Sequence, residues 1–215
     1  SQLDRNLCEL RIPAKTGSKL ELIFPIRPVS EGEITPVVAV DYDQAGQSVM
    51  QCWKREISKG MQVQVPEEPL NNLWRFNVPL TFITADTYPT GDQVLKTSSH
   101  HYEAYWPTPN SMHLQELMQR GYREEVTAYL HPFLDATRRQ PVSNTGASFS
   151  STRGFISGPS EHLAISWVSD HGAILWAASE YYLLTQDSQF LDRWLPTMLD
   201  GLKWIAHERE VTKVR

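Results

Sequence analysis

Two short clusters of aromatic and polar residues carry the side chains best suited to hold a ligand. The first is His100-His101-Tyr102-Glu103-Ala104-Tyr105-Trp106, and the second is Ser166-Trp167-Val168-Ser169-Asp170-His171. Aromatic faces stack on the C–H surfaces of sugars, and short polar side chains hydrogen-bond sugar hydroxyls. The clusters therefore predict a sugar-binding wall, whose candidate contacts are Tyr105, Trp106, Trp167, Asp170 and His171.

A place in the core is the alternative for the tryptophans, with the neighbouring polar residues acting as helix caps. This alternative is favoured for Trp176, because it lies on an apolar helical stripe. Both interpretations stay open for Trp106 and Trp167.

Carboxylates are the next candidates, because glycoside hydrolysis normally uses two carboxyl groups about 5 to 9.5 Å apart. Glu103, Glu161 and Asp170 are the candidate catalytic carboxylates. A solvated loop position is the commoner outcome for Glu103 and Glu161. The sequence does not single out a catalytic pair.

Other chemistries have less support. Asp170-His171 lies near several serines, but no Gly-x-Ser-x-Gly nucleophile motif occurs. His100, His101, His113 and His171 form no HxxxH or HExxH pattern, so we expect no metal site and no cofactor.

Helical periodicity dominates the chain from Pro66 onward. A helix is expected over Leu70–Ala85, and two helical hairpins are expected after it. The apolar stripes of the first hairpin are Leu114, Leu117 and Met118, and Val126 to Leu134. Those of the second hairpin are Ile174 to Leu184 and Leu191 to Ile205. Gly121 is expected to end the first of these helices, and Thr185-Gln186-Asp187-Ser188 to supply a turn and an N-cap. The long loop Gln140–Ser160 is expected to cover or line a site.

The first 65 residues have the alternation of short strands. Strands are expected at Leu7–Ile12, Lys19–Ile26, Thr35–Tyr42 and Met61–Val65, and they suggest part of a β-sandwich. Cys8 and Cys52 are interpreted as two buried thiols, with a single disulfide between neighbouring strands as the alternative.

The helical region resembles a known family. Two stretches look like the first hairpins of six-hairpin glycosidases of the glucoamylase and trehalase type. The first stretch contains Tyr105-Trp106-Pro107 and Gly121-Tyr122. The second contains Asp170 to Trp176, Glu180-Tyr181-Tyr182, Leu184 to Asp187, Phe190-Leu191, Pro196 and Trp204-Ile205. The resemblance implies a mainly α fold, part of an (α/α)6 toroid over residues 66–215, preceded by a small antiparallel β segment over 1–65. It also implies an incomplete toroid whose catalytic carboxylates lie elsewhere.

One position departs from the family. Glucoamylase-like proteins often have an Arg-Asp pair after the Trp-Pro, whereas this chain has Thr108-Pro109-Asn110. Asn110 is the candidate for a neutral sugar contact there, because a bidentate charged clamp is missing. The resemblance therefore implies a glycoside hydrolase-like protein acting on an oligosaccharide or glycoconjugate, or else a non-catalytic carbohydrate-binding or structural toroid protein.

Charge and hydropathy restrict the partners. The formal net charge is −5 over 215 residues, and no basic stripe occurs, so nucleic acid is not an expected partner. The apolar runs are far shorter than the roughly 20 residues that span a bilayer, so no membrane association is expected. A carbohydrate ligand and further parts of the same protein, or another chain, are the expected partners.

Overall fold

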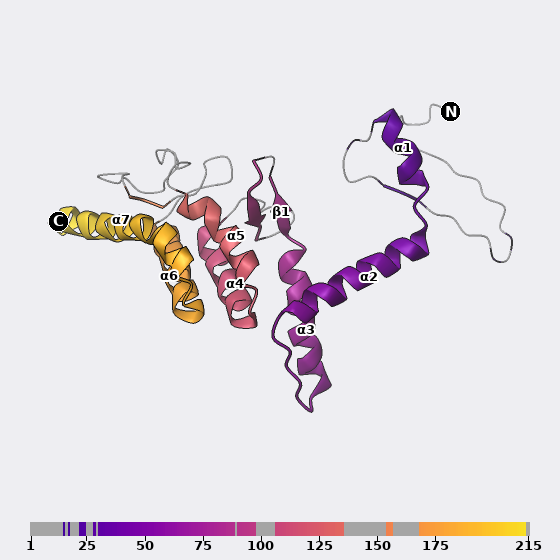
Figure 1. Cartoon of the computed structure of the whole chain (residues 1–215), viewed down its shortest axis with the longest axis horizontal. Coiled ribbons are helices and arrows are strands. Elements are labelled where there is room, and N and C mark those ends of the chain that lie inside the picture. Colours follow the sequence, from indigo (N-terminus) through magenta and orange to yellow (C-terminus); the bar gives the residue numbers. More distant parts are fainter. Residues whose placement is uncertain are drawn as a thin grey trace, which may run out of the picture. The chain divides into compact units, whose positions relative to one another are not determined.

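The computed structural model describes residues 15, 17, 22–24, 28, 30–88, 90–97, 106–135, 154–156 and 168–213. Their helices and strands are α1 (Glu31–Val38), α2 (Tyr42–Lys59), α3 (Glu68–Phe82), β1 (Ala85–Thr87), β2 (Gln93–Leu95), α4 (Pro107–Arg120), α5 (Arg123–Leu134), α6 (Val168–Thr185) and α7 (Ser188–Thr212) (Figure 1). The structure is mainly helical with one small antiparallel sheet, which confirms the predicted helical class. The chain divides into two compact units, Ser1–Cys52 and Trp53–Arg215.

The first unit contains helices at positions where the sequence pattern predicts strands. The amide and hydroxyl of Ser30 both donate to Glu33 Oε2 at 2.8 Å, as in a capping box at the start of α1. Asp41 Oδ1 accepts from the Gln44 amide at 2.7 Å at the start of α2. These caps satisfy groups that a helix leaves without an internal partner. The strand predicted over Thr35–Tyr42 is therefore wrong.

The other predicted strands have different outcomes. Leu7–Ile12 lies outside the described residues, and of Lys19–Ile26 only residues 22–24 are described, outside any strand. Met61–Val65 is not a strand either, because no neighbouring strand pairs with it among the described residues. The side chain of Asn71 instead accepts from the Val65 amide and donates to its carbonyl, both at 2.8 Å.

Cys52 is an exposed thiol on α2, so the expectation of a buried thiol is wrong at this position. Cys8 lies outside the described residues. The predicted domain boundary between residues 65 and 66 stays a prediction.

Helix α3 confirms the helix expected over Leu70–Ala85. One of its faces packs inward through Val78 and Thr81. The opposite face carries an exposed apolar stripe of Leu70, Leu73, Phe76, Leu80 and Ile83. The sheet follows directly, with Ala85 opposite Leu95 and Thr87 opposite Gln93, and the sequence pattern did not predict it.

Helices α4 and α5 form the first predicted hairpin. Gly121 has a left-handed φ of 91°, its amide donates to the Met118 carbonyl at 3.0 Å, and the Tyr122 amide donates to the Leu117 carbonyl at 3.0 Å. This pattern is a Schellman motif, which favours glycine because a left-handed residue with a Cβ is strained. The predicted helix end at Gly121 is confirmed.

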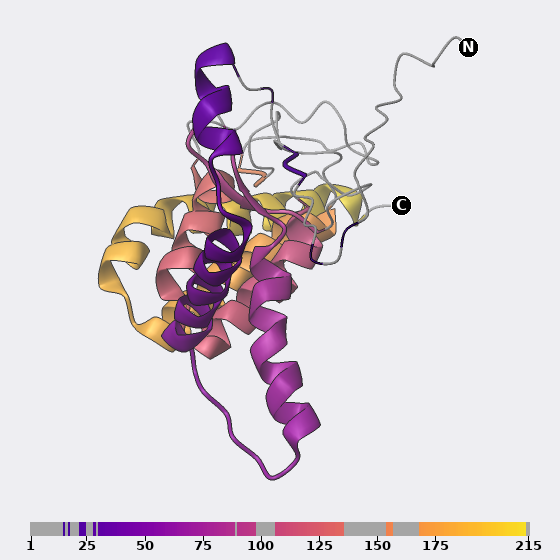
Figure 2. The same cartoon turned by 90° about the vertical axis from the view of Figure 1, so that its right-hand side faces the viewer.

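Helices α6 and α7 form the second predicted hairpin. Gln186 makes the turn with a φ of 54°, and Asp187 Oδ1 accepts from the Phe190 amide at 3.0 Å. The predicted N-cap is therefore confirmed. Helix α4 packs against α6, while α5 contacts α6, α7 and strand β2 (Figures 1 and 2).

The core of the second unit lies between these helices. Many of its fully buried members come from α4, α5, α6 and β2: Val94, Leu95, Leu114, Leu117, Val126, Leu130, Phe133, Leu134, Ile174, Ala177 and Ala178. Ala177 and Ala178 on α6 are fully buried, and small side chains at such positions let neighbouring helices approach closely.

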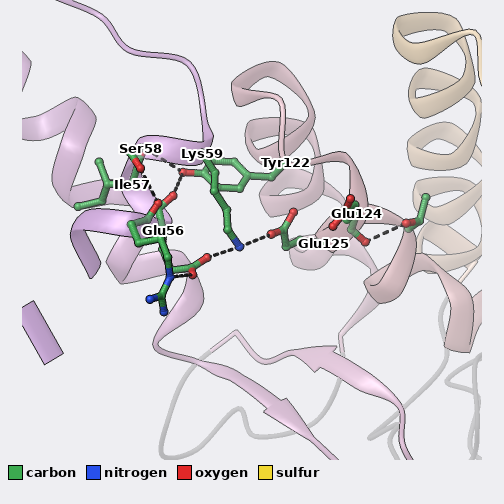
Figure 3. A network of polar contacts seen from close by, with 9 residues as sticks. Glu56, Ile57, Ser58, Lys59, Tyr122, Glu124 and Glu125 are labelled. Carbon is green, nitrogen blue, oxygen red and sulfur yellow. Dashed lines mark hydrogen bonds and ion pairs between the residues drawn. The ribbon is translucent and has the colours of Figure 1, made fainter. Parts of the chain in front are cut away.

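Tyr122 ties the end of α2 to this helical core (Figure 3). Its hydroxyl donates to the Glu56 carbonyl at 2.8 Å. Lys59 bridges Glu56 at 2.6 Å and Glu125 at 3.4 Å, and the hydrogen bond that it donates to Glu56 raises the pKa of Lys59. Gly60 is needed here because an added Cβ would lie 2.4 Å from the Tyr122 ring. The contact therefore holds the end of α2 against the start of α5 within the second unit.

Candidate functional site

The described site candidates gather where α4 and α6 begin. Trp106 precedes α4, Asn110 lies in its first turn, and Asp170 and His171 lie in the first turn of α6. The remaining candidates, Glu103, Tyr105, Glu161 and Trp167, lie outside the described residues.

Asp170 caps the neighbouring helix. Its Oδ1 accepts from the Thr108 hydroxyl at 2.6 Å and from the Thr108 amide at 3.2 Å. The side chain of Trp106 offers no acceptor to cap α4, so the carboxylate of Asp170, which lies on α6, accepts the capping hydrogen bonds instead. This carboxylate also lies at the positive end of the α4 dipole. Asp170 is only 3% exposed. Its geometry is that of a structural cap between helices, and it leaves little access for a substrate.

His171 is fully buried and fixed by two hydrogen bonds. The Ile156 amide donates to Nδ1 at 2.9 Å, so Nδ1 carries no proton. Nε2 lies 3.0 Å from the Gly201 carbonyl, which only accepts, so Nε2 carries the proton. His171 is therefore a neutral imidazole that joins the segment 154–156 to α7.

Aromatic rings complete the surroundings of His171. Phe155 stacks on it with ring centroids 5.1 Å apart, and Trp204 packs edge to face at 4.8 Å. Gly201 allows this approach, because a Cβ there would lie 3.2 Å from His171 Cε1. The sugar contact predicted for His171 finds no exposed atom to support it.

Asn110 and Trp106 contact each other at the start of α4. Asn110 is fully buried, and its Nδ2 donates to the Trp106 carbonyl at 2.7 Å. Its Oδ1 accepts no hydrogen bond from any residue that the structure describes. Trp106 is half-buried as a residue at this helix end, and its indole Nε1 is buried.

Trp176 differs from its predicted place. Its side chain is 48% exposed on α6, so the expectation of a core tryptophan is wrong. The stripe of α6 that faces the core runs instead through Ile174, Ala177, Ala178 and Tyr181. The apolar stripe did not distinguish them from Trp176, because α6 is apolar on several sides.

A groove between α5 and the start of α7 is the feature that the sequence did not indicate. It has a volume of about 460 Å³ and is lined by Glu124, Thr127, Ala128, His131, Asp187, Gln189, Phe190, Arg193 and Trp194. His131 and Trp194 pack edge to face with centroids 5.4 Å apart. The Arg193 guanidinium lies 4.7 Å from the Trp194 ring centre. An aromatic wall with a polar rim can bind a small polar ligand.

A second hollow of about 410 Å³ lies beside the small sheet, lined by Ala85, Asp86, Thr87, Gln93 and Tyr129. Lys96 donates to Asp86 at 2.8 Å and lowers the pKa of that carboxyl. Burial raises the pKa of Tyr129 to about 12. Among the described lining residues, Asp86 is therefore an ionised carboxylate paired with Lys96, and Tyr129 stays protonated near neutral pH.

No cluster of three potential metal ligands occurs within the described part of the chain. Likewise, none of the helices described here is both long and apolar enough to cross a bilayer. No protein-family model, no curated protein and no solved structure shows a significant match to the chain.

Proposed function

We propose that this chain is part of a carbohydrate-active protein built on an α/α toroid, in which it supplies sugar-binding surface and not the catalytic carboxylates. One observation carries the proposal. Two neighbouring helical hairpins are locked together at the helix end that bears Trp106, through the contact of Asp170 with Thr108. A half-buried tryptophan on a rigid helix end suits stacking on a sugar ring.

The packing of the hairpins supports the toroid in this proposal. Helix α4 lies against α6, so equivalent helices of successive hairpins are neighbours, as a ring of hairpins requires. Apolar side chains remain exposed on α6, at Trp176, Leu183 and Leu184, and along the stripe of α3. Further hairpins would cover such lateral faces, as neighbouring repeats do in repeat proteins.

The described carboxylate at this helix end supports binding over hydrolysis. Asp170 is buried and engaged by Thr108, whereas a general acid or nucleophile must reach the glycosidic bond. Glu103 and Glu161 stay candidates for a hydrolytic form of the proposal. A turnover assay of the protein and of Glu103→Gln and Glu161→Gln separates the two forms, since only hydrolysis requires a carboxylate.

Binding to a panel of neutral oligosaccharides tests the proposal, with maltotriose, cellotriose, mannotriose and trehalose as probes. Trp106→Ala should weaken the affinity about tenfold, because the ring loses its stacking surface. Trp176→Ala is the matched control, since it removes an exposed tryptophan from another helix. Absence of binding to every probe, or an equal loss in both variants, would contradict the proposal.

A further inference from the structure

We infer that the groove between α5 and α7 is a second carbohydrate site that binds one neutral sugar ring, separate from the helix end that bears Trp106. This inference rests on the proposed function for its ligand class. Its own support is the groove, whose volume of about 460 Å³ suits a small ligand.

The aromatic side of the groove is preformed. Phe190 is buried, and Trp194 packs against the core and against His131. Because packing holds these rings in place, a ligand would not have to order them on binding. A sugar can place its C–H face against this wall.

The polar side of the groove offers both donors and acceptors. Arg193 and Gln189 supply donors at the exposed rim, and Glu124 supplies a carboxylate on the facing helix. Sugar hydroxyls donate and accept at once, so such a mixed rim matches them. Asp187 contributes less, because it already accepts from the Phe190 amide and the Tyr181 hydroxyl.

Charge argues against an anionic ligand. Among the described lining residues, two carboxylates, Glu124 and Asp187, face one guanidinium, that of Arg193, and the imidazole of His131. A phosphate or a nucleotide would meet repulsion from these carboxylates, whereas a neutral sugar would not.

The test follows the seven tryptophans by fluorine NMR in protein labelled with 5-fluorotryptophan, with each signal assigned by a single substitution. The probes are maltotriose, cellotriose, mannotriose and trehalose, with inorganic phosphate as the anionic comparison. We expect the Trp194 signal to shift with at least one sugar and not with phosphate. A shift at Trp106 alone overturns this inference and leaves the proposed function standing. No shift at either tryptophan overturns both.

Two variants check that a shift at Trp194 reports binding in the groove. Arg193→Gln should weaken the affinity measured at Trp194 about tenfold, because it removes a charged hydrogen-bond donor. Arg209→Gln on the same helix is the control and should leave this affinity unchanged, since Arg209 lies outside the groove. Equal affinities for Arg193→Gln and the unsubstituted protein, or a phosphate response at Trp194, would overturn the inference.

Discussion

His171 shows how a residue with a reactive type can be fully occupied by structure. We expect NMR to find its Nδ1 without a proton and its Nε2 protonated, because Nδ1 accepts from Ile156 and Nε2 faces the Gly201 carbonyl. His171→Ala should lower the free energy of unfolding by about 3 to 5 kcal/mol, since it leaves two buried backbone groups unpaired and a cavity.

Urea unfolding followed by fluorescence measures the effect of His171→Ala. His113→Ala on α4 is the matched control and should cost much less, because His113 is partly exposed. If His171→Ala unfolds like the original protein, the two hydrogen bonds do not hold segment 154–156 on α7.

Tyr129 makes stability depend on pH in the alkaline range. The unfolded chain should ionise this phenol near 10, whereas burial raises the pKa of Tyr129 to about 12 in the folded protein. Between these pH values the folded state holds the extra proton, so stability is intact below about pH 10 and falls as pH rises toward 12. The full loss is about 2 to 3 kcal/mol.

Unfolding free energies at pH 9 and pH 11.5 measure this dependence on Tyr129. Tyr129→Phe should remove this part of the decline, while Tyr42→Phe, at a 72% exposed position, should not. An unchanged decline in Tyr129→Phe would show that Tyr129 ionises as readily in the folded protein as in the unfolded chain.

At the scale of elements, Asp170 on α6 connects two hairpins through its hydrogen bonds with Thr108 on α4. Asp170→Ala should lower the free energy of unfolding by about 1 to 3 kcal/mol, because Thr108 loses the acceptor for its hydroxyl and amide. Asp170→Asn keeps an acceptor oxygen and should cost less. Asp192→Ala, at an exposed position of α7, is the control for loss of a carboxylate. If Asp170→Asn, Asp170→Ala and Asp192→Ala all lower the free energy of unfolding by the same amount, Asp170 does not act as a cap of α4.

Two helix glycines should respond with opposite signs to the same substitution. Gly172→Ala meets nothing within 4 Å, so it should stabilise the protein by about 0.5 to 1 kcal/mol. Gly201→Ala brings a Cβ to 3.1 Å from Leu175 and 3.2 Å from His171, and the hydrogen bonds of His171 prevent it from moving away. We expect Gly201→Ala to destabilise by about 1 to 3 kcal/mol in spite of its better helix propensity. Thermal unfolding of both variants checks the signs, and a stabilised Gly201→Ala would mean that the ring can yield.

Periodicity predicted the elements that bury one clear face. The stripes of α4, α5, α6 and α7 and the signals at Gly121 and Asp187 gave the two hairpins, because each of these is a local property of the chain. The valines of Thr35–Tyr42 favoured a strand, yet the capping pair Ser30 and Glu33 begins a helix there. Ser30 and Glu33 have the spacing of a capping box, which indicates a helix start, whereas the β propensity of the valines favours a strand.

The candidate site was harder to predict than the elements. Asp170 meets Thr108 across 62 positions of sequence, and Ile156 reaches His171 from a separate segment. Residue types indicated that these positions were polar and close to helix ends, but not that they were buried and paired. The groove at Trp194 was missed for the same reason, since its two walls come from α5 and α7 and only their packing brings them together.

At the scale of the whole molecule, the buried apolar core, as far as residues are described, lies in the second unit. Removal of residues 1–52 should therefore leave a fragment, 53–215, that unfolds in one cooperative transition with nearly the stability of the full chain. This fragment keeps the Tyr122 contacts at the end of α2. Circular dichroism during thermal unfolding measures both chains.

A shorter fragment, 84–215, is the comparison for the stability of fragment 53–215. It lacks the carbonyl of Glu56 that Tyr122 binds and the buried side chain of Val78 on α3. These losses should lower its stability by at least about 2 kcal/mol relative to 53–215, because a buried hydroxyl loses its partner and an apolar face is uncovered. If instead 53–215 already loses its cooperative transition, residues before Trp53 contribute to the core, and the two units do not fold independently.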